Sequence, residues 1–160
     1  MFVDGRLLPV DSVAPNFRFQ SLTGSSESAL KDFAGRVVVI DFWASWCGPC
    51  IKTLDGLQTL KGEHPEWEDK VELLAVSVDE QKEVALQIAK DKEWSGMTIV
   101  WAGPELLRTY RIGSLPTIFI IDAQGKIAAA DNRLELAEVL SAGGVFSSTI
   151  GRDRPVAANL

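Results

Sequence analysis

Residues 37–50 read Val-Val-Val-Ile-Asp-Phe-Trp-Ala-Ser-Trp-Cys-Gly-Pro-Cys, and this stretch decides the fold. Its first seven residues are mostly β-branched or aromatic, which is typical of a strand covered on both faces. Apolar residues then recur at three-residue steps from Ile51 to Leu60, the pattern of one buried helical face. We therefore predict a central strand followed by a helix from Cys47 to about Gly62. Both cysteines lie where the strand gives way to the helix.

The rest of the chain alternates between strand and helix patterns. We expect strands over 71–78, 98–101, 117–122 and 126–130, and helices over 80–94, 104–110 and 133–142. A half-buried strand over 17–22 and a short helix over 29–33 would precede the central strand. The last two strands would form a hairpin because Gly125 can supply the left-handed conformation that a short loop needs. This order predicts an α/β architecture with a mixed sheet.

Composition narrows the class of protein. The 160 residues favour one domain, which we place at 1–146, and a poorly ordered tail at 147–160 to which we assign no function. The net charge of -6 repels phosphate backbones, so nucleic acid is not an expected partner. No apolar run is long enough for a membrane span, and the first residues lack the pattern of a signal peptide. The charge-rich segments 63–70 and 79–83 are predicted to be solvated faces.

The chain has two cysteines, and a pair three positions apart cannot join distant parts of a domain. Their spacing indicates redox chemistry. Cys47 in the first helical turn faces unsatisfied backbone N–H groups and the positive end of the helix dipole, so we expect a depressed pKa. Cys50 lies one turn further in, shielded by the helix. We predict that Cys47 attacks a substrate disulfide and Cys50 then displaces the product thiol, with no cofactor.

Two other interpretations of the cysteines compete with this one. A zinc site needs about four ligands, and beyond the cysteines the chain offers only His64, expected to be a solvated loop residue, and carboxylates. No metal is therefore expected. An inert buried pair would not need to begin a helix with Gly-Pro between its members. Of the neighbouring tryptophans, Trp43 is expected in the core, and Trp46 is a candidate for an exposed apolar docking surface.

Four segments resemble the thioredoxin superfamily, and within it the TlpA-like and ResA-like extracytoplasmic branch that shares features with the redoxin and AhpC/TSA families. They are 14–17, 39–50, 76–79 and 110–122, and the resemblance covers roughly residues 14–142. It implies a thioredoxin-like fold with an N-terminal strand extension. It also implies a thiol:disulfide oxidoreductase, acting as a reductant, whose partners are protein disulfide substrates and an upstream thiol electron donor. We expect a monomer.

The same resemblance suggests a location outside the cytoplasm, either periplasmic or membrane-tethered through a removed N-terminus. The cytoplasmic alternative stays open, because this expectation comes from the family branch alone.

The resemblance also supplies site residues. In such proteins the proline before the hairpin strand is cis and lies beside the cysteine pair, and Pro116 matches that position. A cis bond can expose the Leu115 backbone groups to an extended substrate strand. Together with Trp46, Gly48 and Pro49 in the cysteine turn, these residues form the predicted substrate-binding set.

Asp41 is the third predicted catalytic residue. It is the one charged residue in an apolar run and matches the buried aspartate of thioredoxins, whose lysine partner would fall near Ala75. Burial should raise its pKa and suit it to accept the proton of Cys50. An Asp near a strand end that reaches water is the alternative.

The sequence departs from the family pattern in two places. Asp55 stands where thioredoxins often carry a helix-kinking proline, so the helix is expected to run straighter. Thr53 stands where ResA-like proteins carry a glutamate, so any proton handling by that glutamate does not transfer to this chain.

Two further functions compete with a disulfide oxidoreductase. A peroxiredoxin needs Pro-x-x-x-Thr/Ser-x-x-Cys, and the residues before Cys47 contain no proline at the required distance. A non-catalytic thioredoxin-fold interaction module could use the tail as a binding arm.

Overall fold

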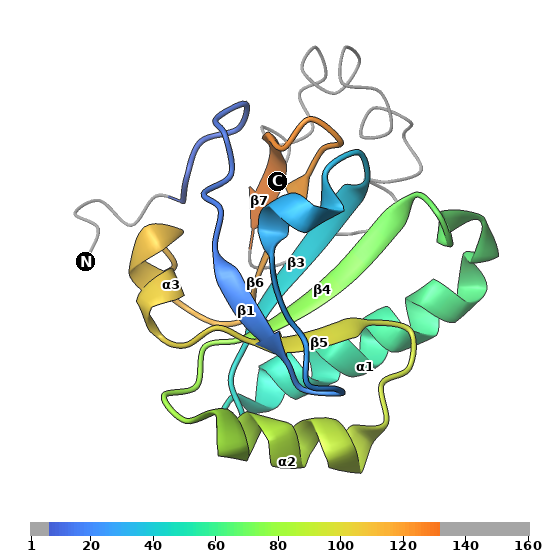
Figure 1. Cartoon of the computed structure of the whole chain (residues 1–160), viewed down its shortest axis with the longest axis vertical. Helices are drawn as coiled ribbons and strands as arrows, with labels where there is room; N and C mark the ends of the chain where they lie inside the picture. The colour runs from blue at the N-terminus through green and yellow to red at the C-terminus, as the bar shows by residue number, and fades with distance from the viewer. Residues whose placement is uncertain (1–6, 132–160) are drawn as a thin grey trace.

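The computed structural model of the chain describes residues 7–131 (Figure 1). The expected helix over 133–142, the end of the predicted domain at 146 and the tail over 147–160 lie outside the described residues. Within 7–131, seven strands form one mixed sheet in the order β2-β1-β5-β4-β3-β6-β7. The strands are β1 (Arg18–Ser21), β2 (Glu27–Ala29), β3 (Val37–Trp43), β4 (Val71–Ser77), β5 (Thr98–Trp101), β6 (Thr117–Ile121) and β7 (Ile127–Asp131).

Three α-helices and two 3-10 helices connect these strands in the described part of the chain. They are α1 (Gly48–Glu63), α2 (Lys82–Lys92), α3 (Glu105–Thr109), η1 (Leu30–Phe33) and η2 (Pro65–Trp67). None of the helices within 7–131 is both long and apolar enough to cross a bilayer. The helices that follow β3 and β4 make the crossover connections that parallel neighbouring strands require.

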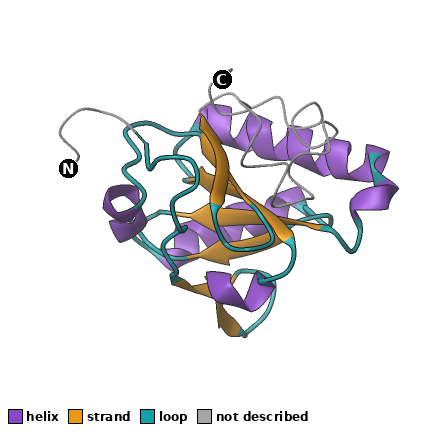
Figure 2. Cartoon of the chain, turned by 90° about the horizontal axis from the view of Figure 1, so that it is seen from above, coloured by secondary structure: helices purple, strands orange, loops and turns teal. Residues whose placement is uncertain are grey.

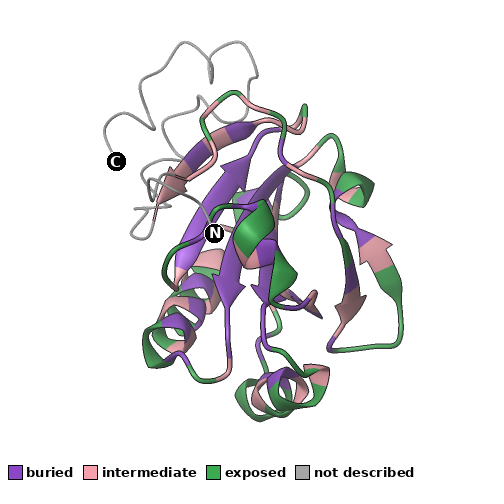
Figure 3. Ribbon diagram, turned by 90° about the vertical axis from the view of Figure 1, so that its left-hand side faces the viewer, coloured by how far each residue is buried: buried purple, intermediate pink, exposed green. Residues whose placement is uncertain are grey.

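The centre of the sheet is buried on both faces, as its β-branched sequence predicts. Every residue of β3 and β6 is buried, and Figure 3 shows the central strands covered along their length. β3 pairs in parallel with β4, with Trp43 opposite Ser77, so both strands end at the same edge of the sheet. β6 runs antiparallel to β3 and begins at that edge, with Thr117 opposite Phe42. The segments after β3, after β4 and before β6 therefore meet there.

The two faces of the sheet carry different helices (Figures 1 and 2). Because successive side chains of a strand point to opposite faces, Phe42 and Trp43 mark one face each. Phe42 packs on Tyr110, which follows α3, with ring centroids 5.1 Å apart. Trp43 packs edge-on against Trp94, which follows α2, at 5.7 Å. Trp94 in turn donates from Nε1 to a carboxylate of α1, so α1 and α2 share the face on which Trp43 lies.

Most predicted boundaries agree with the structure to within two residues, and the N-terminal extension contains the clearest difference. The expected helix over 29–33 is a 3-10 turn, η1, and Ala29 belongs to a strand, β2, that the sequence analysis missed. β2 has three residues and none is β-branched or aromatic. It forms by pairing with the edge of β1, where Arg18 Nη2 and Glu27 Oε1 lie 2.6 Å apart. Gly125 has φ +85°, as predicted for the hairpin loop.

Candidate active site

The two cysteines form a disulfide at the start of α1. Cys47 is the N-cap residue, its Cα lies 5.3 Å from that of Cys50, and its Sγ accepts a hydrogen bond from the Cys50 N–H at 3.2 Å. Pro49 stands in the first helical turn, where its lack of an N–H costs nothing. The predicted transition from strand to helix at the cysteines is confirmed.

Exposure differs sharply among the residues of this turn. Cys50 is fully buried, Cys47 is 6% exposed, and Trp46 is 73% exposed. Gly48 and Pro49 are exposed as well. Trp43 is fully buried, as expected for a core residue. The outer cysteine is thus framed by exposed groups, and the inner one faces the core with Leu54 and Leu57 of α1.

Pro116 lies in the segment that leads into β6, at the same edge as the end of β3. The Leu115–Pro116 peptide bond is cis, as the family resemblance implied. Both residues are half-buried, and the next residue, Thr117, is buried and paired with Phe42. The topology therefore brings the predicted proline to the edge where β3 gives way to the cysteine turn.

Asp41 is a buried carboxylate without a hydrogen-bond partner among the described residues. It is 1% exposed, and neither carboxylate oxygen is bonded. Its register partner in β4 is Ala75, which offers no charge. Desolvation by burial raises the pKa of Asp41 well above its usual value. The alternative of a solvated strand-end aspartate is wrong.

Asp41 and Cys50 share one side of the sheet. Asp41 is two residues before Trp43 in β3, so both side chains point to the face that carries α1. Cys50 belongs to the buried side of α1, which packs on that face. The predicted acid and the inner cysteine are therefore both enclosed between the central sheet and α1.

Sequence reasoning missed Asp79. It belongs to the segment 79–83, which was predicted to be a solvated face, and that prediction is wrong for its first residue. Asp79 is 2% exposed, and its carboxylate accepts hydrogen bonds from Ser45 in the cysteine turn. Its position immediately after the apolar run of β4 was the available signal, because β4 ends beside β3.

Asp55 occupies the family's proline position, and His64 is less solvated than expected. Asp55 lies in a continuous α1 and accepts hydrogen bonds from Trp94 Nε1 at 2.8 Å and Lys92 Nζ at 2.9 Å, which lower its pKa. His64 ends α1 and stacks on Trp67 with centroids 4.2 Å apart, so it is half-buried and only partly solvated.

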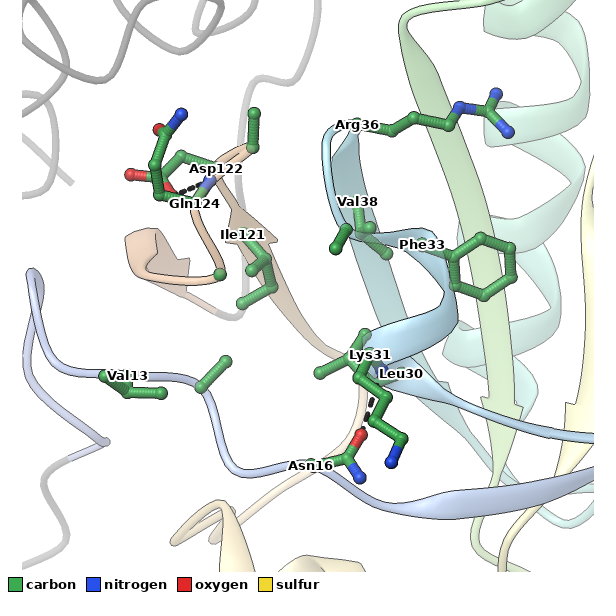
Figure 4. A pocket seen from close by; sticks show the side chains of 14 residues that line it. Val13, Asn16, Leu30, Lys31, Phe33, Arg36, Val38, Ile121, Asp122 and Gln124 are labelled. Atoms are coloured by element: carbon green, nitrogen blue, oxygen red, sulfur yellow. Dashed lines mark hydrogen bonds between the residues drawn. The ribbon is translucent and has the colours of Figure 1, made fainter.

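A cavity of about 290 Å³ lies at the opposite end of the sheet from the cysteines. Figure 4 shows it between the N-terminal segment, η1 and the loop between β6 and β7. Its lining is mainly apolar, with Leu30, Val38 and Ile121 at its base, and contains neither cysteine. It is separate from the candidate active site.

Comparisons with known proteins agree with this geometry. The family model described as the AhpC/TSA family matches residues 10–130. A thiol-disulfide oxidoreductase ResA from Bacillus cereus is 32% identical over 127 residues, which cover 79% of this chain and 71% of that protein. A thiol-disulfide oxidoreductase ResA from Geobacillus thermodenitrificans is 35% identical over 130 residues, with the same two coverages of 79% and 71%.

A solved structure shows the same fold. The thioredoxin domain of a thiol-disulfide oxidoreductase from Bacteroides vulgatus superposes with a TM-score of 0.74 at 25% identity, over 86% of this chain and 99% of that chain. The expected thioredoxin-like fold is confirmed.

Proposed function

The chain belongs to the AhpC/TSA family and is a thiol-disulfide oxidoreductase, and from this premise we propose that it reduces protein disulfides, with Cys47 as the attacking thiol and Cys50 as the resolving thiol. The observation that carries the proposal is the Cys47–Cys50 disulfide at the start of α1, in which Cys47 keeps a small exposed area beside the exposed Trp46 and Gly48 and Cys50 is fully buried. An attacking thiol needs access to a substrate, and a resolving thiol needs protection from one.

The reaction proceeds in two exchanges. The Cys47 thiolate attacks one sulfur of the substrate disulfide, which forms a mixed disulfide and releases the other substrate sulfur as a thiolate. Cys50 then loses its proton and attacks the Cys47 sulfur. This step forms the Cys47–Cys50 disulfide and releases the second substrate thiol. Two electrons have moved to the substrate, and an upstream thiol donor must return two to the protein.

Asp41 is proposed as the acceptor of the Cys50 proton. It lies on the same side of the sheet as Cys50, its carboxylate accepts no hydrogen bond from the described part of the chain, and burial raises its pKa. A carboxylate whose pKa is raised is a stronger base than an ordinary one, which suits it to remove a thiol proton. Thr53 stands in place of the family's glutamate, and the burial of Asp41 on the α1 side of the sheet supports Asp41 as the acceptor.

Substrate binding is proposed for the exposed surface of the turn, formed by Trp46, Gly48 and Pro49, together with Leu115 and Pro116. Trp46 offers apolar area beside the attacking cysteine. Because Pro116 has no N–H, an extended substrate would pair with the backbone of Leu115. The protein acts as a monomer of one domain over 1–146 in this proposal, outside the cytoplasm.

Insulin reduction in the presence of dithiothreitol tests the activity. Wild-type protein should accelerate insulin precipitation, Cys47→Ser should not, and Cys50→Ser should accumulate a mixed disulfide that mass spectrometry detects. An inert wild-type protein would instead favour the interaction module, and peroxide consumption without insulin reduction would favour a peroxiredoxin. Efficient reduction by thioredoxin reductase would argue for the cytoplasmic alternative.

A further inference from the structure

Asp79 is a buried acid at the edge of the sheet where β3 and β4 end, and neither of the two exchange steps requires it. Its carboxylate accepts hydrogen bonds from the Ser45 N–H at 3.1 and 3.0 Å, from Ser45 Oγ at 2.7 Å and from Ser77 Oγ at 2.7 Å. No salt bridge within residues 7–131 includes Asp79. Both carboxylate oxygens therefore accept hydrogen bonds from neutral donors.

The residue that Asp79 holds is a corner of the active-site turn. The Cys47 N–H donates to Ala44 O at 3.1 Å, which closes a turn whose two corners are Ser45 and Trp46. Ser45 is the half-buried corner, and Trp46 is the exposed one. Fixing Ser45 at both its N–H and its hydroxyl therefore fixes the backbone from which Trp46 projects and on which Cys47 follows.

Asp79 is itself anchored on the sheet. Its N–H donates to Ser77 Oγ at 3.1 Å, and its carbonyl accepts from Trp101 Nε1 at 2.8 Å. Next to it, the Val78 N–H donates to Trp43 O at 2.9 Å. The support for the turn thus comes from β4 and β5, more than 30 residues away in the chain from Ser45.

We propose that Asp79 is a positioning residue that acts through Ser45 to hold Trp46 and Cys47 in the arrangement that docks a protein disulfide. The inference rests on the proposed roles of Trp46 and Cys47. A small disulfide needs only the attacking sulfur, whereas a protein disulfide also uses the surface beside it. Loss of the Asp79 contacts should therefore weaken binding of protein substrates more than it slows the exchange itself.

The test compares Asp79→Asn and Ser45→Ala with two controls. Asparagine has one acceptor oxygen and an NH₂ group, so it cannot accept from donors on both sides, and Ser45→Ala removes the hydroxyl donor. Ser45→Thr keeps that hydroxyl at a half-buried position. Asp122→Asn is the matched control, because Asp122 is also a buried acid that accepts backbone N–H groups of a turn, from Gln124 and Lys126 at 2.9 and 3.0 Å. It lies beside the remote cavity (Figure 4).

Insulin reduction should separate the four variants. In Asp79→Asn and Ser45→Ala we expect KM for insulin to rise about three- to tenfold with kcat within about twofold, the pattern of lost binding. Rates with a small aromatic disulfide should stay within about twofold of wild type. Ser45→Thr and Asp122→Asn should keep the wild-type KM. An unchanged KM in Asp79→Asn, or an equal rise in Asp122→Asn, overturns the inference.

Amide hydrogen exchange supplies a readout that does not depend on activity. In the oxidised protein, the Ser45 and Cys47 amides should exchange about fivefold or more faster in Asp79→Asn and at the wild-type rate in Asp122→Asn. Unchanged exchange at Ser45 also overturns the inference. If wild-type protein does not reduce insulin, the proposed function fails, and the exchange rates then decide the role of Asp79 alone.

Discussion

Asp41 and Asp79 are two buried aspartates in the same part of the molecule with opposite surroundings. Asp41 lies within β3 and has no hydrogen-bond partner for its carboxylate within residues 7–131, whereas Asp79 follows β4 and accepts from Ser45 and Ser77 on both oxygens. Both are at most 2% exposed. Burial alone therefore does not decide what an acid does. The two acids differ in the hydrogen-bond donors around them, and the roles proposed for them differ accordingly.

The different surroundings match different proposed roles: proton transfer for Asp41 and support of the active-site turn for Asp79. An acid without donors is destabilised when charged, so its carboxylate is a stronger proton acceptor for a neighbouring group. An acid whose two oxygens accept hydrogen bonds holds its donors in place, and removing its acceptors leaves those donors unsatisfied. Substitutions at the two positions should consequently have opposite effects on stability.

The largest expected effect is the destabilisation caused by Asp79→Ala. It removes the acceptor of one backbone N–H and two hydroxyls that are buried or half-buried, and each unsatisfied donor costs about 1–3 kcal/mol. Because the serine hydroxyls can turn to other acceptors, we expect a loss of about 2–4 kcal/mol in the free energy of unfolding. Urea denaturation of the oxidised protein measures it. A loss below about 0.5 kcal/mol would mean that the Asp79 contacts do not stabilise the turn.

The second expected effect is a slower release of product thiol when Asp41 is replaced. In Asp41→Asn, Cys50 loses its proposed proton acceptor, so release of the product thiol should slow by roughly tenfold to a hundredfold, at the low end for general-base catalysis. Single-turnover release of product thiol from a preformed mixed disulfide, measured between pH 6 and 9, tests this. The initial attack by Cys47 serves as the internal control and should change much less. Equal slowing of both steps would contradict a specific role with Cys50.

The features that the sequence predicted correctly are those whose pattern lies within the element itself. The strands β3 and β4 were predicted from continuous apolar, β-branched runs, and the helix α1 from the three-residue spacing of its apolar residues. Asp41 was identified because one charge within an apolar strand stands out. Asp79 was missed because its burial depends on Ser45, which is distant in the chain and folds back onto the end of β4.

The missed strand β2 has the same explanation. Its residues have little intrinsic strand preference, and the strand exists because β1 offers an edge to pair with. In the same way, Trp94 and Lys92 reach Asp55 only because α2 and α1 share a face of the sheet. Contacts of this kind depend on which elements the fold brings together, and the local sequence pattern of each element does not reveal that.

A third expected effect concerns stability at Asp41. Its folded pKa is raised by burial, so the folded protein keeps this proton to higher pH than the unfolded chain does. Its contribution to stability is fully present below the unfolded pKa of about 3.9 and is lost as pH rises towards the folded pKa. Asp41→Asn should remove this loss and stabilise the protein at neutral pH. Unfolding free energies measured from pH 4 to 8 test the sign, and destabilisation at pH 7 would indicate an ionised, well-partnered Asp41.

The smallest expected effect is at Asp55, an acid that differs from both Asp41 and Asp79 because it lies near the surface. Hydrogen bonds from Trp94 and then Lys92 lower its pKa, so the sign is opposite to that of Asp41. Its contribution to stability is present above the unfolded pKa of about 3.9 and is lost as pH falls through the lower folded pKa. Solvent screens the pair with Lys92, and Asp55→Asn keeps an acceptor for the Trp94 N–H, so the loss at pH 7 should be only about 0.5 kcal/mol.

Lys92→Met is the matched variant for the ion pair, since it removes the charge and keeps the length of the side chain. It should produce a similar small loss at pH 7. If the contact acts as a surface ion pair, 0.5 M NaCl should reduce the difference between each variant and wild type, because salt screens exposed charges. A loss above about 2 kcal/mol in the free energy of unfolding, insensitive to salt, would contradict a surface ion pair. Asp55 would then resemble Asp79 as an acid that stabilises the structure, here by joining α1 to Trp94 and α2.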